Sequence, residues 1–232
     1  GTSQTRMMAT LLVLAVAALA IPALATAPGA PDAGHAVAYS LVVAGVLLVV
    51  FIASIPFSLA GGPGASAEAH EVANVWPMGM AVGVVAVAAV AAAFVSEWFV
   101  AALEPAMASA GLSEAFVGLV IVAIAGNAVE NVAGIQAAWA NKPDLAISLI
   151  LNSSLQVALA LTPVLVVVSF VIGGPPLTLV LSPLLIGALA LAAVLGALIV
   201  YDGESTWLEG LALVGLYVII AFAVWWGPAI GG

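Results

Sequence analysis

The chain is a series of long apolar runs separated by short polar breaks. A membrane-spanning helix needs roughly 20 apolar residues, and each run approaches or exceeds this length. We therefore expect transmembrane helices at 9–26, 36–60, 76–100, 115–138, 145–172, 178–200 and 209–227. Barrel strands would instead alternate apolar and polar positions over about ten residues, and the sequence contains no such alternation. The pattern predicts an all-α polytopic membrane protein with about seven transmembrane helices.

The breaks between the runs contain Gly, Pro, Ser and acidic residues and are typical of loops. The longest break, 61–75, has the composition of a flexible linker. It separates residues 1–60, with two expected helices, from residues 76–232, with five. All six tryptophans lie at the ends of runs, as expected for rings that prefer the membrane interface; they are Trp76, Trp98, Trp139, Trp207, Trp225 and Trp226.

Composition and charge agree with a membrane location and restrict the possible partners. Hydrophobic residues make up 66% of the chain, and the net charge is -9. Nucleic acid is excluded as a partner, because two basic residues cannot neutralise a phosphate backbone. Those residues, Arg6 and Lys142, lie on the same side if every run crosses the lipid bilayer once, and the positive-inside rule makes that side cytoplasmic.

Acidic residues inside apolar runs mark a candidate functional site. A carboxylate at mid-bilayer costs about 3 kcal/mol on insertion scales, so it is rare without a function. Glu130 is the clearest case, because it lies in the middle of the run 115–138. Glu97 stands next to Trp98 near the end of its run, so it either lines the site or is an interfacial carboxylate.

Polar residues with helical spacing accompany Glu130. Asn127, Glu130, Asn131 and Gly134 follow i, i+3, i+4, i+7 spacing and share one helix face. A second polar stripe in the run 145–172 comprises Ser148, Asn152, Ser153 and Gln156. Carboxylate, amide and hydroxyl oxygens are the hard ligands that Ca²⁺ prefers. Zinc or a softer metal is disfavoured, because the chain has no Cys and both His residues lie in loops.

Two other roles for these residues are weaker. Ser, Asn and Gln can simply join membrane helices, with about 0.6 to 2 kcal/mol per hydrogen bond, but a neutral amide would do this as well as Glu130. A membrane enzyme would need a nucleophile and a base, and no intramembrane His, Cys or second acid accompanies Glu130. We expect Glu130 to hold either a cation or a proton, with no prosthetic group.

Several motifs resemble the second repeat of the calcium/proton exchanger (CAX) family, within the cation/calcium exchanger superfamily. They are GNAVEN at 126–131, NKPDLAIS at 141–148, NSSLQVALALTP at 152–163 and YDGESTWLEG at 201–210. The resemblance implies an antiporter of two inverted repeats, in which a glutamate from each repeat meets the cation at mid-membrane. It implies export of Ca²⁺ in exchange for H⁺ by alternating access. A Na⁺-coupled exchanger of Ca²⁺ or another divalent cation, from the same superfamily, is the alternative.

The resemblance also assigns roles along the chain. Glu130 would be the acid of the second repeat, with Asn127, Ser153 and Gln156 nearby and Glu97 as an accessory carboxylate. Residues 1–60 would be two transmembrane helices from the end of the first repeat, 61–75 a cytoplasmic linker, and 76–232 the five-helix second repeat. The protein would be a multi-pass protein of the cell membrane, with the Lys142 loop in the cytoplasm.

The sequence departs from the family pattern at three points. It contains no second GNxxE motif, so the partner glutamate would come from a missing N-terminal repeat half, in the same longer chain or in a second chain. Asn131 stands where the family usually has His, which bears on proton coupling. Asn152 stands where Gly is usual, which bears on how closely the backbone approaches the ion.

Overall fold

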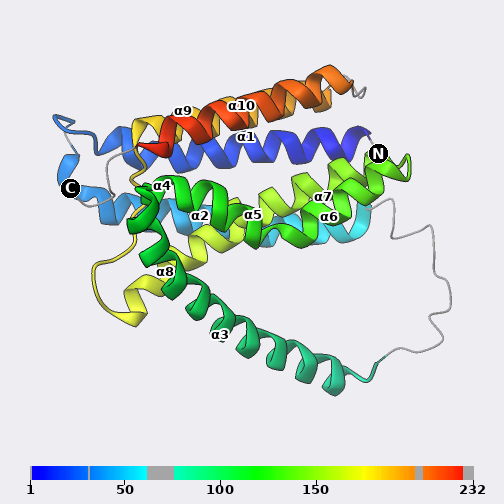
Figure 1. Cartoon of the computed structure of the whole chain (residues 1–232), viewed down its shortest axis with the longest axis horizontal. Coiled ribbons are helices and arrows are strands. Elements are labelled where there is room, and N and C mark those ends of the chain that lie inside the picture. Colours follow the sequence, from blue (N-terminus) through cyan, green and yellow to red (C-terminus); the bar gives the residue numbers. More distant parts are fainter. Residues whose placement is uncertain (1, 31, 62–75, 202–205, 227–232) are drawn as a thin grey trace. The chain divides into compact units, whose positions relative to one another are not determined.

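The computed structural model describes residues 2–30, 32–61, 76–201 and 206–226, and every regular element among them is helical (Figure 1). Six helices are long and apolar enough to cross a membrane, and a broken helix from Glu114 to Trp139 makes a seventh if it counts as one span. The prediction of an all-α chain with about seven such helices is confirmed. Apart from Gly61, the expected linker lies outside the described residues.

The chain divides into two compact units. Unit 1 comprises Gly1–Ala65 and Asn127–Tyr217, and unit 2 comprises Ser66–Gly126 and Val218–Gly232. This division differs from the predicted one into parts of two repeats, which stays a prediction. The elements of unit 1 are α1 Thr2–Ala25, η1 Ala33–His35, α2 Ala36–Gly61, α6 Ala128–Trp139, α7 Pro143–Gln156, η3 Val157–Leu161, α8 Thr162–Ile172 and α9 Pro183–Tyr201.

The core of unit 1 is formed by α1, α2 and the continuous stretch from α7 through η3 to α8. Ala15 on α1 and Ala44 on α2 are 1% and 0% exposed. Small side chains at such positions let membrane helices approach closely, so that dispersion contacts rather than water exclusion hold them together. Leu159 and Val166 complete the core from the third stretch, at 2% and 0% exposure.

Unit 2 contains α3 Met78–Ala110, α4 Glu114–Phe116, the π-helical η2 Val117–Val122, α5 Ala123–Gly126 and the end of α10 Trp207–Trp225. Ser113 caps α4 by accepting a hydrogen bond from the Phe116 amide at 3.0 Å, and its hydroxyl donates to the Val224 carbonyl. The Phe116 and Trp225 rings meet edge to face, with centroids 4.5 Å apart. These contacts hold α4 against the end of α10.

The first turn of α10 begins with a reciprocal capping box. The Thr206 amide donates to the Glu209 carboxylate at 2.8 Å, and the Glu209 amide donates to the Thr206 hydroxyl at 3.3 Å. Each side chain thereby satisfies one amide that has no partner within the helix. Glu209 therefore has a structural role outside the candidate site.

Several predicted boundaries are wrong. α3 continues to Ala110, although we expected it to end at 100. Ala, Leu, Met and Glu are strong helix formers, so the helix outlasts the apolar run and Trp98 lies inside it. α9 begins at Pro183, where proline is favoured because its missing N–H is needed by no carbonyl. Residues 178–182, where we expected this helix to begin, are thus not helical.

Candidate functional site

A tight turn sets α6 against α7 and so positions the polar residues of both. Asn141 adopts the left-handed conformation, with φ 58°, which Asn tolerates better than most residues. Its amide donates to the Ala138 carbonyl at 3.0 Å, and the Lys142 amide donates to the Ala137 carbonyl at 2.9 Å. This pair of bonds is a Schellman motif, and Pro143 then starts α7. The NKPD sequence thereby ends one helix and begins the next within three residues.

Asn127 interrupts the helix that we expected to run unbroken over 115–138. Its φ of −104° and ψ of 20° lie outside the helical region, and it precedes the first residue of α6. The pieces on either side together form a broken span or a re-entrant loop. Glu130 consequently lies in the first turn of α6 and is half-buried. A helix N-terminus carries partial positive charge and stabilises a nearby carboxylate.

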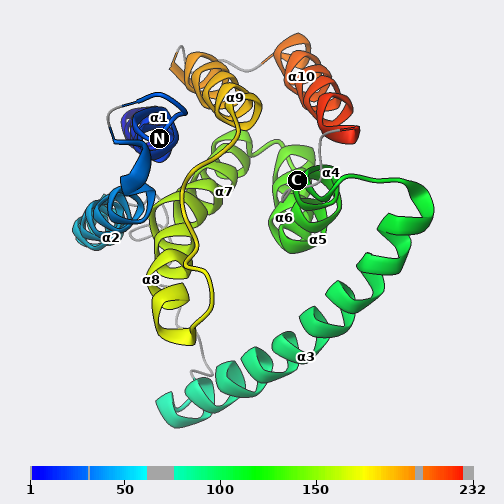
Figure 2. The ribbon, with the colours of Figure 1, turned by 90° about the vertical axis from the view of Figure 1, so that its left-hand side faces the viewer.

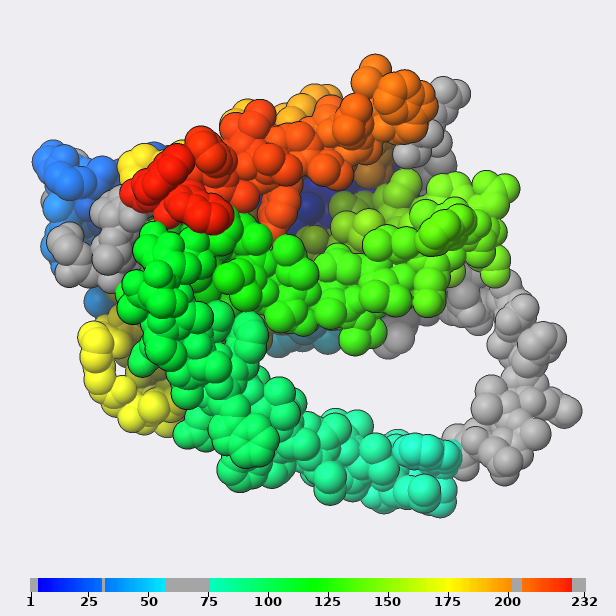
Figure 3. All heavy atoms as spheres, viewed as in Figure 1, coloured from blue at the N-terminus to red at the C-terminus, as the bar shows by residue number. Residues whose placement is uncertain are grey.

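One face of α6 packs against α7. The Ser153 hydroxyl lies 3.4 Å from Asn127 Oδ1, and a Cβ placed on the buried Gly134 would lie 3.8 Å from the Ile150 side chain. Glu130 is three residues after Asn127 and four before Gly134, so it shares the α6 face that meets α7. The structure therefore brings Asn127 of the first predicted polar stripe and Ser153 of the second together here, and the two helices form a continuous surface in the space-filling view (Figure 3).

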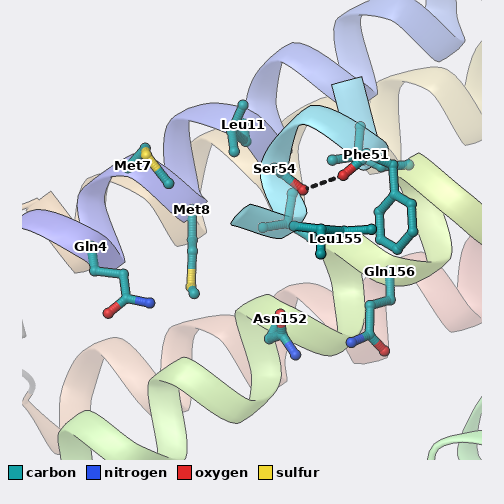
Figure 4. Close-up of a pocket in the computed structure, with 11 residues that line it drawn as sticks. Gln4, Met7, Met8, Leu11, Phe51, Ser54, Asn152, Leu155 and Gln156 are labelled. Carbon is teal, nitrogen blue, oxygen red and sulfur yellow. Dashed lines mark hydrogen bonds between the residues drawn. The ribbon is translucent and has the colours of Figure 1, made fainter. Parts of the chain in front are cut away.

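A different face of α7 lines a cavity in unit 1. The cavity has a volume of about 210 Å³ and lies between α1, α2 and the α7–η3 stretch (Figure 4). Asn152 and Gln156 contribute amide groups to it, and Gln4 from α1 and Ser54 from α2 add further polar groups. Gln156, predicted to belong with Ser153, thus lines this cavity, while Ser153 meets Asn127.

The helix widens directly after Gln156. Residues Val157–Leu161 form a π-helical turn, a feature that frequently occurs at functional sites. Pro163 follows and has no N–H to donate to the Leu159 carbonyl four residues earlier. Leu159 itself lines the cavity. In a π turn the amide five residues later donates instead, as the Thr162 amide does to the Val157 carbonyl.

Sequence reasoning missed two polar residues of the cavity. Gln4 precedes residue 9, where we expected the first helix to begin, but α1 begins at Thr2. Ser54 lies within the apolar run 36–60, where Ser58, four residues later, is its polar neighbour at helical spacing. In both cases the sequence contained a weak indication of a polar site, because a polar residue stands next to or within a long apolar run.

Glu97 lies in unit 2, on α3, and its side chain is exposed. Because α3 extends to Ala110, Glu97 lies well inside the helix and not at its end. The two roles predicted for Glu97 both stay predictions.

The donor set of unit 1 consists of oxygen atoms, which suit a hard cation. Its membrane segments offer the Glu130 carboxylate together with neutral amide, hydroxyl and carbonyl oxygens, which suit Ca²⁺. Within the described parts of the chain, no group of three or more His, Cys, Asp or Glu side chains could hold a metal ion.

Comparisons with known proteins agree with this chemistry. Residues 80–226 match the family described as sodium/calcium exchanger protein. The chain is 37% identical over 161 residues to a Ca²⁺/H⁺ antiporter of Synechocystis, covering 69% of this chain and 42% of the relative. It is 34% identical over 183 residues to the Ca²⁺/H⁺ antiporter ChaA of Bacillus subtilis, covering 76% of this chain and 52% of the relative. The chain thus spans about half the length of these relatives, or less.

A solved structure resembles almost the whole chain. The structure described as native YfkE superposes with a TM-score of 0.78 at 28% sequence identity, covering 97% of this chain and 64% of that one. YfkE is described elsewhere among the solved structures as a Ca²⁺/H⁺ antiporter. The all-α membrane fold predicted from the sequence is therefore confirmed.

Proposed function

The chain belongs to the sodium/calcium exchanger protein family, as a member of its calcium/proton exchanger (CAX) branch, and we propose that it forms part of an antiporter that exports Ca²⁺ in exchange for H⁺. Its relatives are cation/proton antiporters, so the activity of the family is membrane transport and not catalysis. The matched relatives extend well beyond the part that this chain covers. The activity of the whole transporter is therefore proposed for this chain together with what completes it.

The exchange depends on Glu130. Its carboxylate can be neutralised by Ca²⁺ or by a proton, and binding of one excludes the other. Asn127 and Ser153 supply neutral oxygens from the facing helices, Gln156 supplies an amide from the next turn of α7, and Glu97 acts as an accessory carboxylate. Alternating access of this site to the two sides of the membrane then couples the outward movement of Ca²⁺ to the inward movement of protons.

A second carboxylate completes the site. One carboxylate neutralises only half the charge of Ca²⁺, and an uncompensated charge in the membrane is costly. We place the second acid in a first repeat with its own GNxxE motif, either in the same longer protein or in a second chain. Residues 1–60 are then the end of that first repeat, 61–75 the linker, and 76–232 the second repeat. Proteoliposomes that contain the 232-residue chain alone should exchange no Ca²⁺, and measurable exchange would contradict this arrangement.

The observation that carries the proposal is the contact between Asn127 and Ser153 beside Glu130 in the first turn of α6. It supports a site in which an oxygen at the start of α6 and an oxygen from α7 accompany the Glu130 carboxylate. The test is uptake of ⁴⁵Ca²⁺, driven by an imposed pH gradient, in everted membrane vesicles from cells that express this gene in its full reading frame. Uptake should occur without sodium.

Glu130→Gln should abolish that uptake while the protein still reaches the membrane in normal amounts. Glu114→Gln is the matched control, because Glu114 also lies in the first turn of a helix but outside the proposed site. Full activity of the Glu130→Gln vesicles would assign Glu130 a structural role and refute the proposal.

Sodium coupling is the second candidate function. It is favoured by Asn131, because the family usually has a titratable His at this position, and by the description of the matching family as sodium/calcium exchangers. The same vesicles distinguish the two functions: an absolute sodium requirement for uptake would replace H⁺ by Na⁺ as the coupling ion. We place the protein in the cell membrane, with the Lys142 turn and the linker in the cytoplasm.

A further inference from the structure

One continuous helical stretch connects the candidate site to the core of unit 1. It runs from α7 through η3 to α8, and Figure 2 shows α7 leading directly into α8. α7 carries Ser153 and Gln156, whereas α8 is anchored in the core by Val166, which is 0% exposed. The joint between the two helices therefore decides in which direction the polar residues of α7 point.

That joint is the π-helical turn Val157–Leu161. At its end the Thr162 amide donates to the Val157 carbonyl, five residues earlier instead of four. A π turn of this kind holds one residue more than an α-helical turn. Because each residue of an α-helix turns the chain by about 100°, the extra residue rotates all of α7 by this angle relative to α8. Without it, the positions of α7 that now meet α6 or line the cavity would face other neighbours.

Pro163 follows the turn by two residues and favours it over a regular helix. It lies in the first turn of α8, and its side chain is fully buried. In a regular α-helix its ring would collide with the carbonyl of residue 159, four positions earlier, and it has no amide to donate to that carbonyl. A wider turn relieves this collision. The proline thus disfavours the regular helix that competes with the π turn.

A buried proline does not by itself produce such a turn. Pro22 is buried to the same extent inside α1, and α1 is α-helical from Thr2 to Ala25. The packing on both sides distinguishes Pro163, because α7 packs against α6 and α8 packs against α2. These contacts hold the two helices out of phase by one residue, and Pro163 opposes the regular helix that would bring them back into phase.

We propose that Pro163 is a positioning residue for Ca²⁺ exchange: it keeps the π turn in place and thereby directs the Gln156 amide and the Ser153 hydroxyl. The inference rests on the proposed function, which assigns both groups to the cation, and adds the residue that orients them. The side chain of Pro163 has no oxygen to offer the ion. An amide at position 163 would supply the donor that a regular helix needs, so the turn would lose its extra residue and α7 would rotate.

A cross-link across the cavity tests this rotation. The chain has no cysteine, and Asn152 on α7 and Ser54 on α2 line the same cavity. With Asn152→Cys and Ser54→Cys in the full-length exchanger in membrane vesicles, a short bifunctional thiosulfonate should join the two thiols, as read by mass spectrometry. Adding Pro163→Ala should lower the yield about tenfold, because position 152 turns away from α2. Pro22→Ala removes an equally buried proline from a helix without a π turn and should leave the yield unchanged.

A one-residue deletion tests whether the phase of α7 is what matters. Deleting Ala160 from the Pro163→Ala variant removes the extra residue, so a regular helix then presents α7 in its original direction. Pro163→Ala alone, with Asn152 and Ser54 intact, should raise the Ca²⁺ concentration for half-maximal ⁴⁵Ca²⁺ uptake about tenfold. The deletion should restore both this concentration and the cross-link. A proline that only fills space predicts no such rescue, because the deletion removes still more contacts.

An unchanged cross-link in Pro163→Ala would show that packing alone holds the turn, and a loss that the deletion does not restore would make Pro163 a packing residue; either result overturns the proposal. If the variant without Ala160 does not reach the membrane, deletion of Leu161, which is exposed, removes the same extra residue. Failure of both deletions to reach the membrane counts as a loss that is not restored.

The cross-link needs neither Ca²⁺ nor a pH gradient, so it succeeds or fails independently of the transport assay. Vesicles of the unchanged protein that take up no Ca²⁺ under a pH gradient would contradict the proposed function. The cross-linking yields would still show whether Pro163 sets the direction of α7.

Discussion

Ser153 and Ser154 offer a comparison that separates an ion ligand from a packing residue. They are neighbours on α7, and each loses only a hydroxyl on substitution by Ala. The Ser153 hydroxyl lies 3.4 Å from Asn127 Oδ1 on the facing helix, whereas the Ser154 hydroxyl donates to Ile150 of its own helix at 2.9 Å. Ser153→Ala should weaken Ca²⁺ binding, and Ser154→Ala should not.

The expected magnitudes follow from the geometry. A hydroxyl donor usually lies about 2.5–3.0 Å from its acceptor, so the contact of Ser153 with Asn127 is long and weak as a link between helices. Its loss should cost about 0.6 kcal/mol of stability or less, the average for such pairs in membranes. A neutral oxygen on a charged partner contributes about 1.5–3 kcal/mol. Loss of an ion ligand therefore corresponds to tenfold weaker Ca²⁺ binding or more, at about 1.4 kcal/mol per factor of ten.

Two measurements on the same variants decide between these roles. The Ca²⁺ concentration for half-maximal ⁴⁵Ca²⁺ uptake in everted vesicles reports on the ion, and thermal unfolding in detergent reports on packing. Ser153→Ala should raise that concentration at least tenfold with almost no change in the unfolding temperature. Equal half-maximal concentrations for the Ser153 and Ser154 variants would refute the assignment of Ser153 as a ligand. A large loss of thermal stability would instead make Ser153 a packing residue.

Three further substitutions test other parts of the structure. Glu97→Gln should reduce Ca²⁺ uptake less than Glu130→Gln does, as expected of an accessory carboxylate; an equal loss in the vesicle assay would make it a primary ligand. Asn141→Gly should fold normally, whereas Asn141→Val should lose about 1–2 kcal/mol, because a β-branched residue is strained at φ 58°; equal unfolding temperatures would contradict this. Glu209→Ala should cost about 1 kcal/mol through the lost capping box and speed amide hydrogen exchange in the first turn of α10, and unchanged exchange would show that the cap contributes nothing.

The membrane helices could be predicted because their cause is local. An apolar run of sufficient length dictates a helix in lipid, since the helix satisfies every backbone group within the segment. The ends of helices were less predictable, because different forces set them. α3 extends to Ala110 through residues of high helix propensity, beyond its apolar run, and α9 starts at Pro183 where backbone chemistry and not hydropathy decides.

The candidate site was predictable as a set of residues but not as an arrangement. Spacing alone put Asn152, Ser153 and Gln156 in one polar stripe. In the structure Ser153 meets Asn127 of α6, while Asn152 and Gln156 line a cavity with α1 and α2. Consecutive side chains on a helix point about 100° apart. The residues of one polar stripe can therefore contact two different adjacent helices. Which neighbour each position meets depends on helices far away in the sequence.

The break at Asn127 and the π turn after Gln156 have one physical consequence in common. Both interrupt a regular membrane helix, in which every backbone amide and carbonyl would otherwise be hydrogen-bonded within the segment. Interrupting the helix next to Glu130 places a helix N-terminus beside the carboxylate, and the π turn at Val157–Leu161 lies just before Pro163, which has no amide to donate. In the proposed exchange, the break would supply partial positive charge to the Glu130 carboxylate when no cation is bound. Because Ca²⁺ carries two charges, this carboxylate would still need the second acid that we place in a first repeat, since an uncompensated charge in the membrane is costly.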